Sequence, residues 1–249
     1  MPEPSPSLSL ILPAYNEEAR LARTLDTLLA STWVEKGASE ILVVDDGSTD
    51  GTATIARAYA ERHPSIRLLR HENNRGKGYS VRRGFQEARG EVVLFTDVDL
   101  SAPIGEAEKL LDELHRGADI AIGSRAVGRA HTRVQRPAIR ALLSYLFRAV
   151  CFLILGLPYK DTQCGFKAFQ RERTRSLFDR QRLDRYAFDA ELLFLASQER
   201  LRVVEVGINW EHARHSKIRL WTDGSRMLAD LLRVRWWWLS GGYGKGQRQ

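Results

Sequence analysis

The clearest indication of the fold lies in the run Val92-Val93-Leu94-Phe95-Thr96-Asp97-Val98-Asp99. Its first five residues are apolar or β-branched, which is typical of a strand buried on both faces of a parallel sheet. Two carboxylates follow directly, so this strand ends on charged side chains. Four more short runs are rich in Val, Ile and Leu and are bounded by Gly, Pro, Asn or Asp, and they comprise residues 8–12, 40–44, 66–70 and 119–123.

Helical stretches separate these strands, at residues 17–29, 52–62, 78–88 and 106–115. In the first of them, Leu21, Leu25, Leu28 and Leu29 form one apolar face. The alternation predicts an α/β fold, a layered and mostly parallel sheet with right-handed crossovers. Ligands of such sheets bind beyond the carboxyl ends of the strands, so we expect the site at residues 13–17, 45–48 and 96–99.

The second half of the chain changes character after Arg125. An apolar segment at residues 138–157 precedes the string Asp161-Thr162-Gln163-Cys164-Gly165-Phe166-Lys167. A helix at 188–198, a strand at 203–206 and a basic, Trp-rich helix follow. We predict a disordered leader at 1–7 and a single domain at 8–249, with membrane-interface segments near 133–157 and 225–240.

The basic charge is localised, which narrows the class of partner. The net charge is +7, yet residues 129–160 hold five Arg and one Lys with no acid, and residues 217–249 hold seven basic residues against two Asp. Both segments are also apolar, a combination that favours a membrane surface over nucleic acid. No apolar run approaches the ~18 residues of a spanning helix. With two cysteines and no signal-peptide pattern, we expect a cytoplasmic, peripherally membrane-associated protein.

Asp97 and Asp99 form a candidate metal site. Two carboxylates at a strand end repel each other unless a cation lies between them. Mg²⁺ or Mn²⁺ prefers such oxygen ligands and would also bind a diphosphate. The alternative is a solvated turn that happens to contain two aspartates.

Asp45 and Asp46 end another predicted strand, and the chain contains no glycine-rich phosphate loop. Carboxylates there are suited to a base N–H and to ribose hydroxyls. The alternative is a turn in which Ser48 or Asp50 caps the following helix.

These strings together resemble a known family. Leu12-Pro13-Ala14-Tyr15-Asn16-Glu17-Glu18, Val44-Asp45-Asp46-Gly47-Ser48-Thr49-Asp50-Gly51-Thr52, Asn74-Arg75-Gly76-Lys77-Gly78 and Asp97-x-Asp99 resemble, in order and spacing, family 2 glycosyltransferases of the GT-A fold. Residues 97–103, 123–125 and 161–167 are similar to polyprenyl-phosphate sugar synthases, and within these to the dolichyl-phosphate β-glucosyltransferases. One departure is Val98, where the family more often has Ala.

The resemblance implies an inverting enzyme that moves glucose from UDP-glucose onto a polyprenyl or dolichyl phosphate. It implies catalytic roles for Asp99 and Arg125, and a metal held by Asp97 and Asp99. The implied donor nucleotide site comprises Pro13, Tyr15, Glu17, Asp45, Asp46, Lys77 and Asp97. The implied acceptor phosphate site comprises Arg125, Arg140 and Ser144.

Helical spacing is consistent with the acceptor site, because Arg133, Arg136, Arg140, Ser144 and Arg148 recur every three or four residues. A helix packed on the core with an arginine stripe in water is the alternative. Three other functions stay open: a GDP-mannose-dependent polyprenyl-phosphate mannosyltransferase, a family 2 transferase to a hydroxyl acceptor, and a non-catalytic basic protein that binds membrane or nucleic acid. A hydroxyl acceptor would need a general base, for which Asp161, Asp189 and Glu191 are candidates.

Overall fold

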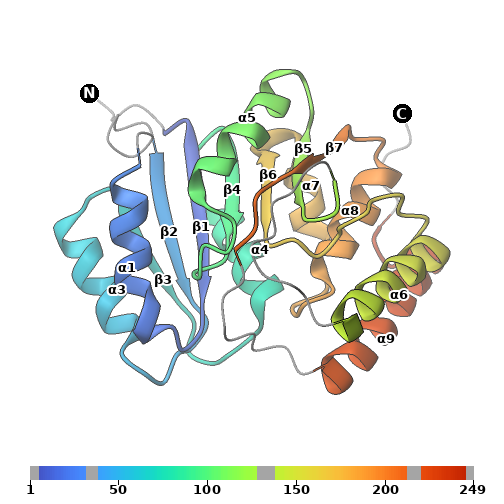
Figure 1. Ribbon diagram of the computed structural model, residues 1–249, viewed down its shortest axis with the longest axis horizontal. Helices are drawn as coiled ribbons and strands as arrows, with labels where there is room; N and C mark the ends of the chain where they lie inside the picture. Colours follow the sequence, from blue (N-terminus) through green and yellow to red (C-terminus); the bar gives the residue numbers. More distant parts are fainter. Residues whose placement is uncertain (1–5, 32–38, 128–137, 212–219, 245–249) are drawn as a thin grey trace.

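The computed structural model describes residues 6–31, 39–127, 138–211 and 220–244, with the side chains of 138–145 and 220–223 left out (Figure 1). Residues 1–5 of the predicted leader, and Arg133 and Arg136 of the predicted stripe, lie outside the described residues. Ser7, also in the predicted leader, accepts a hydrogen bond from the backbone N of Val92 through its carbonyl oxygen.

One sheet runs through both halves of the chain, in the order β3-β2-β1-β4-β6-β5-β7. Every neighbouring pair is parallel except those made by β6, which runs antiparallel to β4 and β5. The structure therefore confirms the predicted mostly parallel α/β sheet. Its strands are β1 (Leu8–Ala14), β2 (Ser39–Asp45), β3 (Ile66–Arg70), β4 (Val92–Thr96), β5 (Ile120–Ser124), β6 (Phe166–Gln170) and β7 (Val203–Gly207).

Strand β6 was not predicted, because Lys167 interrupts its apolar pattern. The structure buries this lysine and pairs its ammonium group with the Asp189 carboxylate at 2.6 Å. A charge that finds a buried partner can occupy a central strand, which periodicity alone does not reveal.

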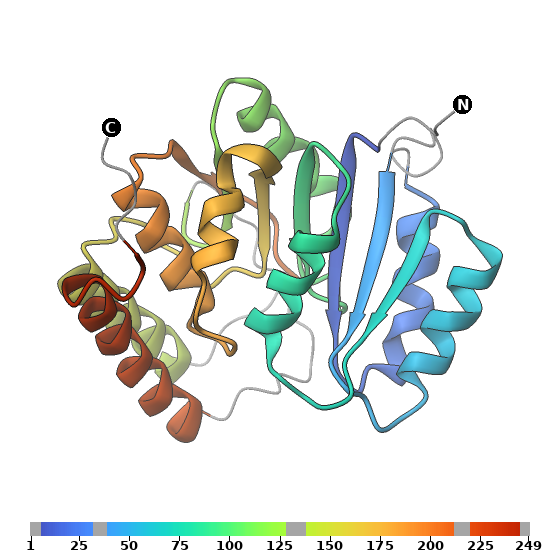
Figure 2. The ribbon, with the colours of Figure 1, turned by 180° about the vertical axis from the view of Figure 1, so that it is seen from behind.

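Helices cover both faces of the sheet (Figures 1 and 2). One face packs on α1 (Glu18–Leu29), α3 (Thr52–Arg62) and α5 (Ala107–His115), which follows the short 3₁₀ helix η1 (Ile104–Glu106). The other face packs on α4 (Lys77–Glu87), α7 (Arg171–Arg180) and α8 (Phe188–Gln198). Helix α8 is buried from Phe188 to Ala196, so its two acids, Asp189 and Glu191, need partners inside the protein.

The remaining helices, α6 (Ala138–Leu155) and α9 (Leu220–Leu239), lie side by side at one end of the molecule (Figures 1 and 2). Each packs one side onto the core, through Cys151 and Leu155 in α6 and through Leu231 and Val234 in α9. Among the described residues, no helix is long and apolar enough to cross a bilayer. Both helices thus keep another side directed away from the core.

Helix α7 packs into the core on the α4 and α8 face of the sheet through an aromatic cluster, and this packing generates a stability prediction. Phe178 is 1% exposed and stacks on Phe85 with ring centroids 3.7 Å apart. We expect Phe178→Ala to lower the free energy of unfolding by about 3–5 kcal/mol, because it leaves a cavity. Phe152→Ala on the exposed side of α6 is the control, with an expected change within about 0.5 kcal/mol. Urea unfolding measures both, and equal losses would contradict the assigned packing.

Candidate active site

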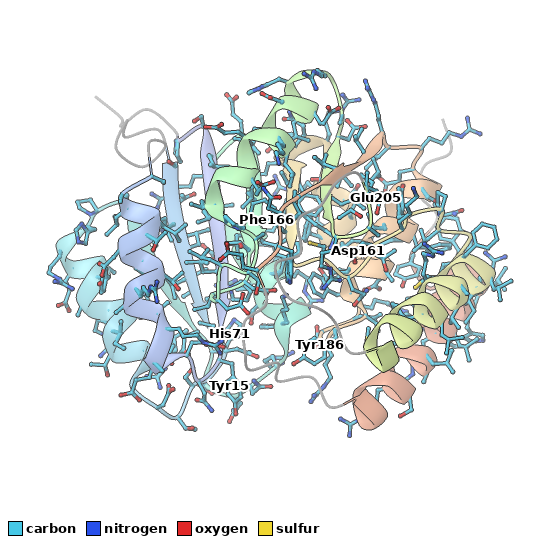
Figure 3. The ribbon with its side chains drawn as sticks, in the orientation of Figure 1. Tyr15, His71, Asp161, Phe166, Tyr186 and Glu205 are labelled. Atoms are coloured by element: carbon cyan, nitrogen blue, oxygen red, sulfur yellow. The ribbon has the colours of Figure 1, made fainter. Side chains whose placement is uncertain are left out.

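The carboxyl ends of β1, β2 and β4 meet at one edge of the sheet. Ala14 pairs with Asp45 across β1 and β2, and Ile11 pairs with Phe95 across β1 and β4. This register brings the residues that follow each strand to the same edge, where Figure 3 shows Tyr15 and His71. The predicted convergence of residues 13–17, 45–48 and 96–99 is therefore correct.

Asp45 presents an unsatisfied carboxylate oxygen at this edge. Its side chain is fully buried, and Oδ1 accepts a hydrogen bond from the backbone N of Ser48 at 3.1 Å. Oδ2 lies 3.2 Å from Nε of Arg70 but accepts no hydrogen bond from the part of the chain that is described. The Arg70 charge compensates this oxygen without a well-directed hydrogen bond, so an N–H group from a ligand would stabilise it further. The geometry is compatible with the predicted role of Asp45 in binding a base.

Asp46 points to the other side of the sheet, where it holds a loop. Its carboxylate accepts hydrogen bonds from the backbone N atoms of Arg75 and Gly76 at 2.9 and 2.8 Å. Nδ1 of His71 lies 3.0 Å from Asp46 Oδ1. The Asp46 carboxylate thus positions the loop that leads to Lys77, and its place in the donor nucleotide site stays a prediction.

The loop after β1 is fastened to the loop after β2. Asn16 adopts a left-handed conformation (φ 51°), and its Oδ1 accepts a hydrogen bond from the backbone N of Thr49 at 2.9 Å. The Glu17 backbone N donates to Thr52 Oγ1 at 2.7 Å, while its carboxylate pairs with Arg20 at 2.8 Å. Tyr15 remains 38% exposed, so its ring is accessible for stacking on a base. Pro13 is half-buried beside it, in β1.

Lys77 and Asp97 form the central ion pair of the site, with Nζ and Oδ1 2.5 Å apart. Burial by itself would lower the pKa of Lys77, but the carboxylates of Asp97, Asp189 and Asp99 outweigh it and hold the pKa above its usual value. Lys77 is therefore a fixed positive charge. A Cβ on Gly165 would overlap the Asp97 carboxylate and lie 2.9 Å from Lys77 Nζ, so a larger residue at this position would displace the side chains of the ion pair.

Asp99 lies on the same turn and is half-buried. Its Oδ1 accepts a hydrogen bond from the backbone N of Ser101 at 2.9 Å. Leu100, between them, has a φ of 45°, a conformation that is strained for a leucine. The turn thus fixes the direction of Asp99 at some conformational cost, a pattern common at functional sites.

Arg125 follows β5 and is held from two sides. Its Nε and Nη2 donate to the two Asp161 carboxylate oxygens at 2.6 and 2.8 Å. Its guanidinium also lies over the Trp210 ring, 4.9 Å from the centroid. Burial opposes the charge of Arg125, but Asp161 outweighs it and raises the Arg125 pKa, with a smaller contribution from Asp97.

Asp161 is correspondingly shifted in the other direction. Burial alone would raise the pKa of its carboxyl group, but the hydrogen bonds and charge of Arg125 hold the pKa below its usual value. Figure 3 shows Asp161 near Glu205, which accepts a hydrogen bond from the Asp161 backbone N at 2.8 Å. Arg125 is thus a preorganised cation near the donor carboxylates.

The other two predicted acceptor residues, Arg140 and Ser144, lie in α6, but their side chains are outside the described residues. Their assignment to a lipid phosphate stays a prediction.

The three candidate general bases are all engaged inside the protein. Asp161 pairs with Arg125, and Asp189 pairs with the buried Lys167. Glu191 accepts hydrogen bonds from the backbone N atoms of Arg182 and Leu183 and from the Tyr243 hydroxyl. Carboxylates used in this way are poorly placed to deprotonate a hydroxyl acceptor.

The donor set fits a divalent metal ion if a ligand's phosphates complete the coordination. Among the described residues, no group of three or more His, Cys, Asp or Glu side chains could hold a metal. Mg²⁺ commonly binds to one or two carboxylates together with substrate phosphates, which suits the accessible oxygens of Asp97 and Asp99. The described charges also fit: three cations (Lys77, Arg125 and Lys167) lie among four carboxylates (Asp97, Asp99, Asp161 and Asp189).

Comparisons with known proteins agree with this geometry. A family model described as "Glycosyl transferase family 2" matches residues 9–178. A dolichyl-phosphate β-glucosyltransferase of Drosophila melanogaster is 38% identical over 244 residues, covering 93% of this chain and 75% of that protein. The human protein of the same name is 35% identical, covering 96% of this chain and 78% of its own length.

Solved structures show the same fold. Glucosyl-3-phosphoglycerate synthase from Mycobacterium tuberculosis, solved with Mg²⁺ and UDP, superposes with a TM-score of 0.66 at 23% identity, covering 92% of this chain and 79% of that one. Mannosyl-3-phosphoglycerate synthase from Rubrobacter xylanophilus gives 0.64 at 21% identity, with 98% and 77% covered. The expected GT-A fold is confirmed.

The chain therefore belongs to glycosyl transferase family 2 and is a glycosyltransferase. Within that family its similarity over most of its length is to dolichyl-phosphate β-glucosyltransferases, as the sequence motifs predicted.

Sequence reasoning missed two residues of the site. His71 lies at the end of β3, against Asp46 and Tyr79, and its buried Nε2 has no hydrogen-bond partner in the described part of the chain. Lys167 lies beneath the site and is bonded to Asp189 and to the Cys164 carbonyl oxygen. A lysine between Phe166 and Ala168 was a detectable signal for the second residue, whereas nothing in the sequence marks His71.

The close approach of Gly165 to the central ion pair generates a prediction. Gly165→Ala must displace Asp97 or Lys77, so we expect activity to fall by up to about a hundredfold, the loss that a misplacement of roughly 1 Å can cause. Gly105→Ala is a matched control, since nothing lies within 4 Å of its added Cβ. Initial rates at saturating substrate measure the effect, and circular dichroism checks the fold. Equal activity of the two variants would refute the assigned contact.

Proposed function

We propose that this glycosyltransferase moves glucose from UDP-glucose to a dolichyl or related polyprenyl phosphate at a membrane surface, with inversion at the anomeric carbon. The observation that carries the proposal is the clustering of Asp45, Lys77, Asp97, Asp99 and Arg125 at one sheet edge, at the open end of strands β1, β2 and β4. The names of the relatives and the UDP found in the solved neighbours support the choice of donor and acceptor.

The reaction follows from this arrangement. A phosphate oxygen of the acceptor forms a bond to C1 of glucose while the bond from C1 to the UDP oxygen breaks, and UDP leaves with the electron pair. The acceptor phosphate is largely dianionic near neutral pH, so no general base is needed. This matches the engagement of Asp161, Asp189 and Glu191 within the protein, and it favours a phosphate over a hydroxyl acceptor.

The protein's own residues orient the two substrates and stabilise the negative charge of the leaving diphosphate. Asp45 accepts the N–H of the base, Tyr15 stacks on it, and Pro13 and Glu17 complete the pocket. Lys77 stabilises the negative charge that develops on the leaving diphosphate, in a partly buried environment that strengthens its effect. Arg125, together with Arg140 and Ser144, holds the acceptor phosphate.

Asp97 and Asp99 would hold Mg²⁺ or Mn²⁺, which would neutralise the diphosphate of the donor. Without it, the described carboxylates outnumber the cations by one, and a UDP donor would add further negative charge. Lys77 contacts only one Asp97 oxygen, so the other Asp97 oxygen and the Asp99 carboxylate are available to the metal ion.

A membrane-facing surface, formed by α6 and α9, supports the lipid acceptor. Apart from Tyr15, every large hydrophobic side chain that is exposed among the described residues lies on these two helices: Leu146, Phe152, Leu153, Leu228, Leu232, Trp236 and Leu239. On α9 these recur at spacings of three and four, so they share one face. Exposed Arg226, Arg233 and Arg235 lie on the same helix, as expected at an anionic lipid headgroup layer.

Only one tryptophan of the 236–238 cluster is directed outward. Trp236 is 64% exposed, whereas Trp238 packs edge-on against Phe194 and Trp237 against Tyr243. We therefore assign the membrane contact to Trp236, and the tertiary packing of α9 to its two neighbours.

The activity itself is tested with defined substrates. We expect glucosyl transfer from UDP-glucose to dolichyl phosphate in the presence of Mg²⁺ or Mn²⁺, and no transfer by Asp99→Ala despite a normal fold. Arg140→Lys should reduce kcat/KM for the lipid roughly tenfold to a hundredfold with nucleotide binding unchanged, because an ammonium cannot replace a forked guanidinium. A preference for GDP-mannose, or for an unphosphorylated polyprenol, would overturn the donor or the acceptor assignment respectively.

Membrane association is tested on vesicles that contain anionic lipid. We expect the wild type to co-sediment and to dissociate partly at high salt. Trp236→Ala should weaken partitioning roughly tenfold without destabilising the protein, since one exposed indole is lost from the interface. Trp238→Ala is the matched control and should lower the melting temperature instead. If both variants bind vesicles like the wild type, the surface is wrongly assigned.

A further inference from the structure

The segment that follows α9 folds back onto the core. The backbone N of Gly242 donates to the Trp237 carbonyl oxygen at 2.7 Å. Tyr243 is buried, and its hydroxyl donates to Glu191 Oε1 at 2.6 Å. The segment after α9 is thereby joined to a carboxylate in the buried part of helix α8.

Glu191 also binds residues 181–185, which lie in the connection between α7 and α8. Its Oε1 and Oε2 accept hydrogen bonds from the backbone N atoms of Arg182 and Leu183 at 3.0 and 2.8 Å. The Arg182 guanidinium also lies over the rings of Trp237 and Tyr243. The buried Glu191 carboxylate therefore fixes the backbone of this connection, and the Tyr243 hydroxyl is the third hydrogen-bond donor to the same carboxylate.

Residues 181–185 in turn hold the first turn of α4. The N–H groups in the first turn of a helix have no acceptor within that helix. In α4, the backbone N of Tyr79 instead donates to the Asp184 carbonyl oxygen at 3.0 Å. Gln181 Nε2 donates to the Gly78 carbonyl oxygen at 2.9 Å. A Cβ on Gly78 would lie 2.7 Å from the Leu183 carbonyl oxygen, so the two backbones are in direct contact.

Lys77 is the first residue of α4, and it carries the ion pair with Asp97 at 2.5 Å. Asp46 holds the preceding residue, Gly76, from the opposite side. The direction of the Lys77 side chain thus depends on two supports, one from Asp46, which directly follows β2, and one from residues 181–185.

We propose that Tyr243 is a positioning residue for the donor: through Glu191 and residues 181–185, it fixes the α4 turn that carries Lys77. The inference rests on the proposed function, because that function assigns Lys77 to the donor diphosphate. It adds a residue from the far end of the chain, more than 160 positions from Lys77, to the machinery of donor binding.

Tyr243→Phe tests this with the ring and its packing retained. We expect UDP affinity, measured by calorimetry with Mg²⁺ present, to weaken roughly threefold to tenfold, in the range of moderate couplings between connected residues. Tyr59→Phe is the matched control, because the Tyr59 hydroxyl makes a bond of the same length, 2.6 Å, to Asp26, on the other side of the sheet. Its UDP affinity should equal that of the wild type.

A double-mutant cycle separates positioning from general destabilisation. If Tyr243 acts through Lys77, its substitution should have no further effect on UDP affinity in a Lys77→Met background. An equally large loss in that background, or an unchanged affinity of Tyr243→Phe, would overturn the proposal. Glu191→Gln, which keeps its carbonyl acceptor, serves as a second variant should Tyr243→Phe fail to fold, and the same outcomes apply. If wild-type protein does not bind UDP at all, the proposed function itself fails.

Discussion

The ion pair between Lys77 and Asp97 is the interaction on which the site depends. Several carboxylates lie at or beneath one sheet edge, and burial and mutual repulsion would destabilise them without cations among them. Lys77 supplies one cation from α4 and joins that helix to the end of β4. Gly165 leaves room for this pair, because a Cβ there would overlap the Asp97 carboxylate and lie 2.9 Å from Lys77 Nζ. Sheet, helix and site are therefore fixed by the same contact.

One buried pair and one partly buried pair flank this centre and explain how so many charges coexist. Lys167 with Asp189 lies beneath it, and Arg125 with Asp161 beside it. A buried ion pair seldom adds net stability compared with apolar residues of similar size. Ion pairs beneath the ligand-binding edge of the sheet make sense if their charges are oriented in advance for a polyanionic substrate. Preorganised charges need no rearrangement during the reaction. The cost in stability is offset by the large aromatic core on the α4, α7 and α8 face.

The molecule divides its tasks between two regions. The carboxyl ends of β2 and β4 carry Asp45, Asp97 and Asp99, and the helices α6 and α9 present exposed apolar side chains and arginines at one end of the molecule (Figure 1). Trp237, Trp238 and Tyr243 point toward the core and hold α9 against α8. A lipid-linked acceptor needs both regions at once, since its phosphate must reach the sheet edge while its chain stays in an apolar layer.

The sequence was sufficient to predict every strand except β6, the order of the early helices and the three acidic strand ends, because apolar periodicity reports burial directly and parallel strands share one carboxyl edge. The antiparallel insertion of β6 and the partners of Lys167, Arg125 and Glu191 became known from the tertiary structure. Asp189, Asp161 and Tyr243 lie 22, 36 and 52 positions from Lys167, Arg125 and Glu191 respectively. The tertiary structure also decided that Trp236 faces outward while its neighbours pack inward. Local pattern states whether a side chain can be buried, but the choice among many possible charged partners depends on which backbones come close enough to touch.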